Sequence, residues 1–332
     1  MGYKNHAEEF QQLVEERMQK GNNKVLVTGA AGYLASSVID ELLQKGFKVL
    51  GVDNNFKQTC DTLIPFISHE NFSFRLGDIT DEEFVKGLYD DVGYVVHAAA
   101  IVGAPACKRY KTLSSLVNVG GTENVIKYKP KYVKLVYCNT GSIYKGGLGI
   151  CDENSVVDPQ SHYAKTKLEA EKVVLADDNT ISHRYATAAG LSRTNMRVNL
   201  LANDLTYQAV TNRTLTIFEA DFMRTFIHCR DISSAIVFTI ENFDIMKAKQ
   251  RVYNVGDDAQ NYTKRDLVNM IKEKTHCHVS FAETEKDPDQ RDYGYDSSAL
   301  YSFGWRPKFT MDQTINEIMK AVPILTPWDK YR

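Results

Sequence analysis

Blocks of apolar residues alternate with amphipathic blocks along most of the chain. Six short runs rich in β-branched residues predict β-strands, at residues 24–28, 47–53, 72–78, 94–99, 132–138 and 180–186. Between them, apolar residues at helical spacing predict α-helices, the clearest at residues 33–45, 112–127 and 161–176. Nearly continuous apolar strands that alternate with helices predict an α/β fold, with a doubly wound parallel sheet between two layers of helices.

The pattern divides the chain into three parts. In residues 1–23, apolar positions at helical spacing predict a short amphipathic extension that docks on the body or on a neighbouring subunit. Residues 24–189 carry the strand–helix alternation. Residues 190–332 have shorter elements and predict a smaller C-terminal α/β lobe, mainly for substrate binding, with some segments returning to the first domain. Capping-box patterns at residues 80–83 and 263–266 predict two further helix starts.

The charges of the chain nearly cancel, with 40 Lys and Arg against 42 Asp and Glu and a formal net charge of −2. Bulk binding to nucleic acid or to an anionic membrane needs a basic surface, so we expect neither partner. Of the 14 arginines, 11 follow residue 180. Because the planar guanidinium suits phosphate, this skew predicts an anion-binding site in the C-terminal half.

Six cysteines are scattered along the chain and form no C-x-x-C pattern. Such spacing is typical of reduced thiols, so we expect neither a disulfide framework nor a metal site. The first residues include Glu8, Glu9, Glu15 and Glu16 and lack the basic and then apolar order of a signal peptide. These features predict a soluble, cytoplasmic protein.

The first predicted strand runs into the glycine-rich segment TGAAGYLA, residues 28–35, which opens a helix. This arrangement places backbone N–H groups and the positive helix end beside a pyrophosphate. Asp53 ends the second strand 24 residues after Gly29, where a carboxylate can accept hydrogen bonds from the adenosine ribose. Because it also repels a 2′-phosphate, we expect a Rossmann-type domain that binds NAD, tightly, rather than NADP.

Further cofactor contacts are expected where other strands end, because open α/β sheets bind ligands beyond the carboxyl ends of their strands. Asp78 follows the third strand and can meet the adenine edge. The small Ala98 and Ala99 follow the fourth and let a cofactor pass. His97, just before them, is expected to be a packing residue. The predicted cofactor contacts of this region are Gly29, Ala31, Gly32, Tyr33, Leu34, Asp53, Asn54, Asp78, Ile79, Ala98, Ala99 and Ala100.

Tyr163 and Lys167 lie four residues apart in the predicted helix 161–176, and therefore on one face of it. A free tyrosine titrates at about pH 10 and is a weak base at neutral pH. A lysine ammonium one turn away, together with an oxidised nicotinamide, stabilises the phenolate. The pair is predicted to be a general base that takes a hydroxyl proton while hydride leaves the same carbon.

The order of the motifs adds to their specificity. In sequence they are TGAAGYLA, Asp53, Asp78, HAAA at 97–100, NTGSIY at 139–144 and YAKTK at 163–167. This set resembles the extended short-chain dehydrogenase/reductase family, in particular its NAD-dependent nucleotide-sugar epimerases and dehydratases. The resemblance covers roughly residues 24–310. It implies that Thr140 bonds the reacting oxygen, that Asn118 is a structural and proton-relay position at the cofactor, and that Tyr163 and Lys167 also contact the cofactor.

The resemblance extends to the substrate. Asn203, Arg224 and Arg291 match family residues that hold the diphosphate of a sugar nucleotide, and bidentate contacts to phosphate give the arginines a physical reason. The implied substrate is a nucleotide-diphosphate sugar, in sugar-nucleotide biosynthesis. The family also implies a homodimer or a tetramer, formed through the predicted helices 112–127 and 161–176.

The two residues after Thr140 bear on the reaction. Family dehydratases carry an Asp-Glu pair there, whereas this chain has Gly141 and Ser142, which cannot do that acid–base chemistry. We therefore expect a 4-epimerase, or a net 4-dehydrogenase that converts a GDP-linked hexose or heptose to its 4-keto sugar. A carbonyl reductase for a non-nucleotide substrate and a dinucleotide-binding protein without turnover are further alternatives.

Overall fold

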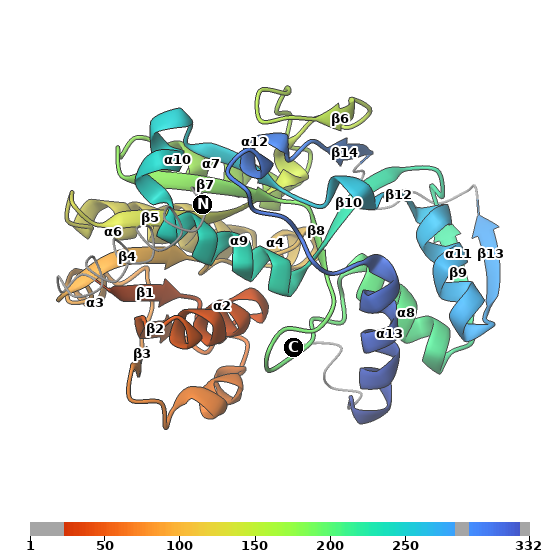
Figure 1. Ribbon diagram of the computed structural model, residues 1–332, viewed down its shortest axis with the longest axis horizontal. Coiled ribbons are helices and arrows are strands. Elements are labelled where there is room, and N and C mark those ends of the chain that lie inside the picture. The colour runs from red at the N-terminus through yellow and green to blue at the C-terminus, as the bar shows by residue number, and fades with distance from the viewer. Residues whose placement is uncertain (1–22, 283–291, 326–332) are drawn as a thin grey trace, which may run out of the picture.

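The computed structural model describes residues 23–282 and 292–325 (Figure 1). The predicted N-terminal amphipathic helix and Arg291, one of the predicted diphosphate ligands, lie outside these residues. Within the two described ranges, no helix is both long enough and apolar enough to cross a membrane.

A seven-stranded sheet, parallel throughout, forms the centre of the molecule (Figure 1). In spatial order its strands are β11 (Val252–Val255), β7 (Thr180–Tyr185), β5 (Lys134–Thr140), β4 (Val92–His97), β1 (Lys24–Thr28), β2 (Lys48–Asp53) and β3 (Phe72–Leu76). The chain adds β2 and β3 on one side of β1 and then returns to add the rest on the other side. The order reverses between β1 and β4, and ligands bind at such switch points. The predicted doubly wound α/β fold is confirmed.

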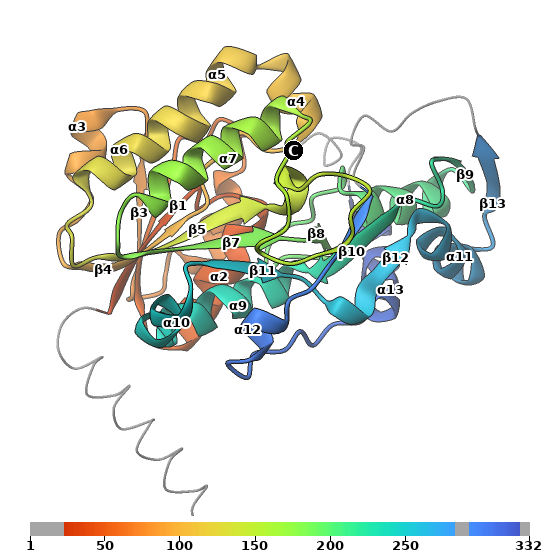
Figure 2. The ribbon, with the colours of Figure 1, turned by 90° about the horizontal axis from the view of Figure 1, so that it is seen from above.

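Helices cover both faces of the sheet (Figure 2). One face carries α2 (Tyr33–Gln44), α9 (Cys229–Glu241) and α10 (Phe243–Lys249). The other face carries α3 (Glu82–Lys86), α5 (Lys111–Ser115), α6 (Gly121–Tyr128) and α7 (His162–Leu175). Because side chains alternate along a strand, Val25 and Val27 of β1 pack in the first core and Leu26 in the second.

Two details of the predicted helices are corrected by the structure. The helix predicted at 112–127 consists of α5 and α6 joined by one π-helical turn, Leu116–Gly120. The capping box predicted at 80–83 is wrong, because Asp81 caps α3 by accepting from the Phe84 N–H, while the Thr80 hydroxyl donates to Asp78. The box at 263–266 is confirmed at the start of α11 (Lys264–Thr275).

A second lobe lies to one side of the central sheet (Figure 1). Its five-stranded sheet contains β12 (Asn261–Thr263), β10 (Met223–His228), β14 (Tyr293–Tyr295), β6 (Gly149–Cys151) and β8 (Thr187–Ala189). A smaller parallel pair is formed by β9 (Thr214–Phe218) and β13 (His278–Ala282). The helices of the lobe are α8 (Leu201–Thr211), α11 and α13 (Met311–Ala321), which pack with these strands around one apolar core.

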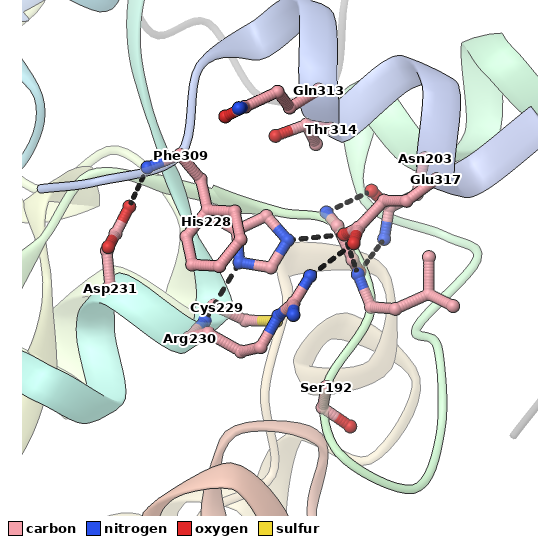
Figure 3. A network of polar contacts seen from close by, with 12 residues as sticks. Ser192, Asn203, His228, Cys229, Arg230, Asp231, Phe309, Gln313, Thr314 and Glu317 are labelled. Carbon is pink, nitrogen blue, oxygen red and sulfur yellow. Dashed lines mark hydrogen bonds and ion pairs between the residues drawn. The ribbon is translucent and has the colours of Figure 1, made fainter.

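Glu317 of α13 joins the lobe to the central domain (Figure 3). Its carboxylate accepts hydrogen bonds from the Leu191 N–H at 2.8 Å, from His228 at the end of β10, and from Arg230 in α9. The neighbouring Gly190 carbonyl accepts from the Tyr33 hydroxyl at 2.7 Å. The Glu317 carboxylate and the Gly190 carbonyl therefore connect α13 and the loop after β8 with α2 and α9, two of the helices on one face of the sheet.

We expect Glu317→Ala to lower the free energy of unfolding by about 2–4 kcal/mol, because three donors lose their acceptor at a partly buried junction. The control is Asp312→Ala on the same helix, whose ion pair with Lys274 is largely exposed and which we expect to cost less than about 1 kcal/mol. Urea unfolding curves measure both values. Equal losses in the two variants would contradict a special role for Glu317.

Candidate active site

A cavity of about 850 Å³ opens at the carboxyl ends of the central strands, where the strand order reverses. Its wall begins at the turn between β1 and α2 and continues along the ends of β2, β4 and β5. The far wall belongs to the second lobe and includes Arg224 of β10 and Leu201 of α8. The volume lies in the range of ligand sites, and both domains contribute to it.

The turn between β1 and α2 can accept only glycine at its first position. Gly29 has a φ of +71°, and a Cβ there would lie 2.8 Å from the backbone Cα of Ala99. This close approach packs the turn onto the end of β4. The N-terminus of α2 then faces the cavity, and its first turn, Tyr-Leu-Ala-Ser, carries no carboxylate. The turn therefore fits a pyrophosphate held by N–H groups and the helix dipole.

Asp53 ends β2 on the wall of the cavity. Burial raises the pKa of its carboxyl group, while hydrogen bonds from the N–H groups of Asn55 (2.8 Å) and Ala31 (3.1 Å) oppose that shift. These bonds orient the carboxylate beside the glycine turn, where it can accept from ribose hydroxyls. Next to it, the Asn54 side chain donates to Asp78 at 2.8 Å. These residues fit the adenosine half of NAD.

All the predicted cofactor contacts from the strand ends lie on the wall of this cavity. The glycine-rich turn and the strand ends therefore border the same space. The contacts are Gly29, Ala31, Gly32, Tyr33, Leu34, Asp53, Asn54, Asp78, Ile79, Ala98, Ala99 and Ala100. Thr140, Tyr163, Lys167 and Arg224 lie on the same wall. Their roles stay predictions, but the structure brings them together.

Asn118 and Asn203 do not lie on that wall. The Asn118 amide accepts from the Ile101 N–H and donates to the Ile101 carbonyl and to Thr166, and the side chain is 1% exposed. The Asn203 amide bonds both backbone groups of Gly190 and the carbonyl of Arg197, at 0% exposure. Both side chains therefore hold loops that border the cavity, and the roles expected for them at the cofactor and the diphosphate stay predictions.

The three predicted catalytic residues come from two adjacent elements. Thr140 is the last residue of β5, and its hydroxyl oxygen accepts from the Ser142 N–H at 3.2 Å. Tyr163 and Lys167 lie one turn apart near the start of α7, which Ser161 caps by accepting from the Ala164 N–H. All three side chains face the cavity, so a substrate hydroxyl placed there can meet the threonine and the tyrosine together.

Lys167 is deeply buried at 3% exposure. Burial lowers the pKa of its ammonium group to about 8, and the nearby carboxylate of Glu171 opposes the shift. The side chain of His97, at the end of β4, lies between the hydroxyls of Thr28 (2.7 Å) and Thr122 (2.9 Å). Burial lowers the pKa of His97 to about 3, so it is neutral and acts in packing, as predicted.

Two cations of the wall were not assigned a site role from the sequence. Lys57 follows β2 and Arg197 lies between β8 and α8, and both line the cavity. Burial lowers the pKa of Lys57, and the charge of Arg197 lowers it further. An anion between them would relieve this repulsion. In the sequence both stand in polar loops that are hard to tell from a solvated surface, although the arginine skew included Arg197.

Comparison with known proteins assigns the chain to a family. The sequence profile of the NAD dependent epimerase/dehydratase family matches residues 25–256. The chain therefore belongs to this family of enzymes, a branch of the extended short-chain dehydrogenases/reductases, and the expected resemblance is confirmed. NAD is the cofactor of the family, in agreement with the fit of the glycine turn and Asp53.

Three similar proteins show the breadth of the family. The chain is 24% identical over 323 residues to dTDP-D-glucose 4,6-dehydratase of Mus musculus, covering 90% of this chain and 88% of that protein. It is 31% identical over 165 residues to a 3 beta-hydroxysteroid dehydrogenase/isomerase of Mycobacterium tuberculosis, covering 47% and 43%. The structure of UDP-glucuronic acid 4-epimerase from Bacillus cereus, in complex with UDP-glucuronic acid and NAD, matches 91% of this chain and 100% of that chain, with a TM-score of 0.79 and 22% identity.

We expect Gly29→Ala to weaken NAD binding at least about 10-fold, because the new Cβ would displace either the turn or the Ala99 backbone. Gly46→Ala is the matched control, since Gly46 also has a positive φ, +79°, but no neighbouring atom lies within 4 Å of the place that its Cβ would take. The control carries the backbone strain alone and should bind NAD within about 2-fold of the parent. Calorimetric titration with NAD measures both, and equal effects would contradict the steric explanation.

Proposed function

We propose that the protein is an NAD-dependent enzyme that acts at C4 of a nucleotide-diphosphate sugar, as a 4-epimerase. The observation that carries this proposal is the single cavity that Thr140, Tyr163 and Lys167 share with Arg224 of the second lobe. The residues proposed to oxidise a hydroxyl group and a side chain suited to bind an anion thus face the same cavity. The likeness to a UDP-glucuronic acid 4-epimerase supports the proposal.

In this proposal the chain provides the proton chemistry. The Tyr163 oxygen takes the proton of the sugar C4 hydroxyl, and the Thr140 hydroxyl holds the same oxygen. The charge of Lys167 stabilises the tyrosinate. NAD, held by the glycine turn and Asp53, would accept the hydride from C4 and would be its source when the hydride returns to the opposite face of the sugar. Tyr163 then gives its proton back to the C4 oxygen, so the overall change is an inversion at C4.

The packing around Gly141 argues against a 4,6-dehydratase. A Cβ on Gly141 would lie 1.5 Å from the hydroxyl oxygen of Tyr295, and Tyr293 donates to the Gly141 carbonyl. An acidic side chain therefore has no room at this position. The Ser142 hydroxyl, at the next position, accepts from Thr140 at 3.1 Å. Neither residue supplies the carboxyl pair that family dehydratases carry beside the catalytic threonine.

The charges of the cavity support a nucleotide-diphosphate substrate. Arg224 is 4% exposed and lies near the catalytic end of the cavity, while Arg197 and Lys57 face it from other elements. Three cations that line one cavity suit phosphate oxygens and are unsuited to an uncharged apolar molecule. This favours a sugar nucleotide over the substrate of a carbonyl reductase. A net 4-dehydrogenase of a GDP-linked hexose or heptose uses the same residues and remains the second candidate.

We expect Tyr163→Phe to keep NAD affinity within about 2-fold and to lower turnover at least about 100-fold, because only the proton acceptor is removed. Tyr132→Phe, which changes an exposed tyrosine at the start of the β5 region, is the control and should leave both values unchanged. NAD titration and single-turnover kinetics measure the two effects. Turnover at the parent rate in Tyr163→Phe would overturn the assignment of the base.

Incubation with UDP- and GDP-sugars in D₂O distinguishes the reactions. Inversion at C4 without deuterium in the product indicates an epimerase, because the migrating hydride comes from the sugar itself. Accumulation of NADH with a 4-keto product indicates the net dehydrogenase. Deuterium at C5 would show proton abstraction there and would contradict the argument from Gly141. NMR of the product and NADH absorbance give these readouts.

A further inference from the structure

An aromatic ring lies against the ammonium group of Lys167. The Nζ atom is 4.0 Å from the ring centroid of Tyr137, a residue of β5 three positions before Thr140. Tyr137 is 1% exposed, and its ring also packs against His97 at a centroid distance of 5.6 Å. A cation over the face of a buried ring is stabilised by the ring quadrupole. The Tyr137 ring thus contacts both His97 and the Lys167 ammonium group.

In the part of the chain that the structure describes, the hydroxyl group of Tyr137 forms no hydrogen bond that would account for a tyrosine at this position. Its oxygen is buried and, within the described residues, has no hydrogen-bond partner. Burial raises the pKa of Tyr137 well above its ordinary value, so the phenol is neutral and competes for no proton. What the side chain offers to the site is the face of its ring.

We propose that Tyr137 is a positioning residue, whose ring holds the Lys167 ammonium charged and in place beside Tyr163. This inference rests on the proposed function, because it gives the charge of Lys167 a task in the reaction. A carboxylate in place of the ring would neutralise the ammonium and hold it through a directed hydrogen bond. A ring face attracts the cation and leaves its N–H groups free to point toward Tyr163 and the cofactor.

The other groups around Lys167 do not hold its ammonium group in place, although the charge of Glu171 also raises the Lys167 pKa. Glu171, one turn further along α7, gives both carboxylate oxygens to Arg184, at 3.1 and 2.8 Å. Burial raises the pKa of the Cys138 thiol of β5 and of the Cys107 thiol of α4 (Ala104–Arg109), so both are neutral. His97, behind the ring, is neutral as well. Among the described neighbours of Lys167, Tyr137 is thus the one whose ring face lies against the ammonium group.

The test changes the electron density of the ring and keeps its shape. Tyr137→Phe removes a hydroxyl without a partner and keeps the ring face, so the Lys167 pKa and the turnover should stay within about 0.3 units and about 2-fold. Pentafluorophenylalanine at position 137 keeps the ring and reverses its quadrupole. We expect it to lower the Lys167 pKa by about one unit or more. At pH 8, where about half of Lys167 is charged in the parent, kcat should then fall about 5-fold, with KM and NAD affinity unchanged.

The Lys167 pKa is measured by NMR on protein labelled with ¹³C-lysine, with Lys167→Gln identifying the signal. This readout needs no substrate, so it tests the ring contact even when no sugar nucleotide is turned over, and failure of the proposed function is seen separately. An unchanged Lys167 pKa in the fluorinated protein would overturn the proposal. So would a fall in kcat without a shift of that pKa, since a merely structural role gives that result.

Discussion

The close packing of two backbones, Gly29 against Ala99, sets the geometry on which the site depends. It brings the turn after β1 onto the end of β4, at the point where the sheet reverses its order. A dinucleotide can then lie across the strand ends, with its phosphates at the start of α2. On the β4 side the next strand is β5, which carries both Thr140 and Tyr137. The glycine turn and the residues proposed for proton transfer are therefore adjacent because of strand order.

The second lobe completes the site because it is joined to the same turn. Tyr33, the first residue of α2, bonds the Gly190 carbonyl, and Asn203 bonds both backbone groups of that glycine. Glu317 fixes the next residue, Leu191. The helix α2, at the glycine turn, and the lobe that bears Arg224 are thus both bonded to the short segment 190–191. The amide of Asn203, for which a diphosphate contact is expected, bonds the backbone of this segment.

The sequence predicted what depends on periodicity and on local turns. The strands, the helices, the glycine turn, Asp53 and the Tyr163–Lys167 pair follow from spacing within one element, and the structure places them as expected. Contacts between distant elements could not be predicted in this way. Spacing does not show that the amides of Asn118 and Asn203 bond loop backbones, or that Arg197 lies close enough to Lys57 to lower its pKa. The nearly continuous apolar run of β5 predicts that Tyr137 is buried, but not that a lysine lies on its ring.

The contact between Gly141 and Tyr295 has a consequence for how this scaffold can change its chemistry. The residue that restricts the position beside the catalytic threonine belongs to β14, more than 150 positions away in the chain. A carboxylate can take the Gly141 position only if Tyr295 of β14 moves or is replaced. The side chains that this position tolerates are therefore set jointly by the end of β5 and by β14, and a carboxylate there calls for a second, distant change.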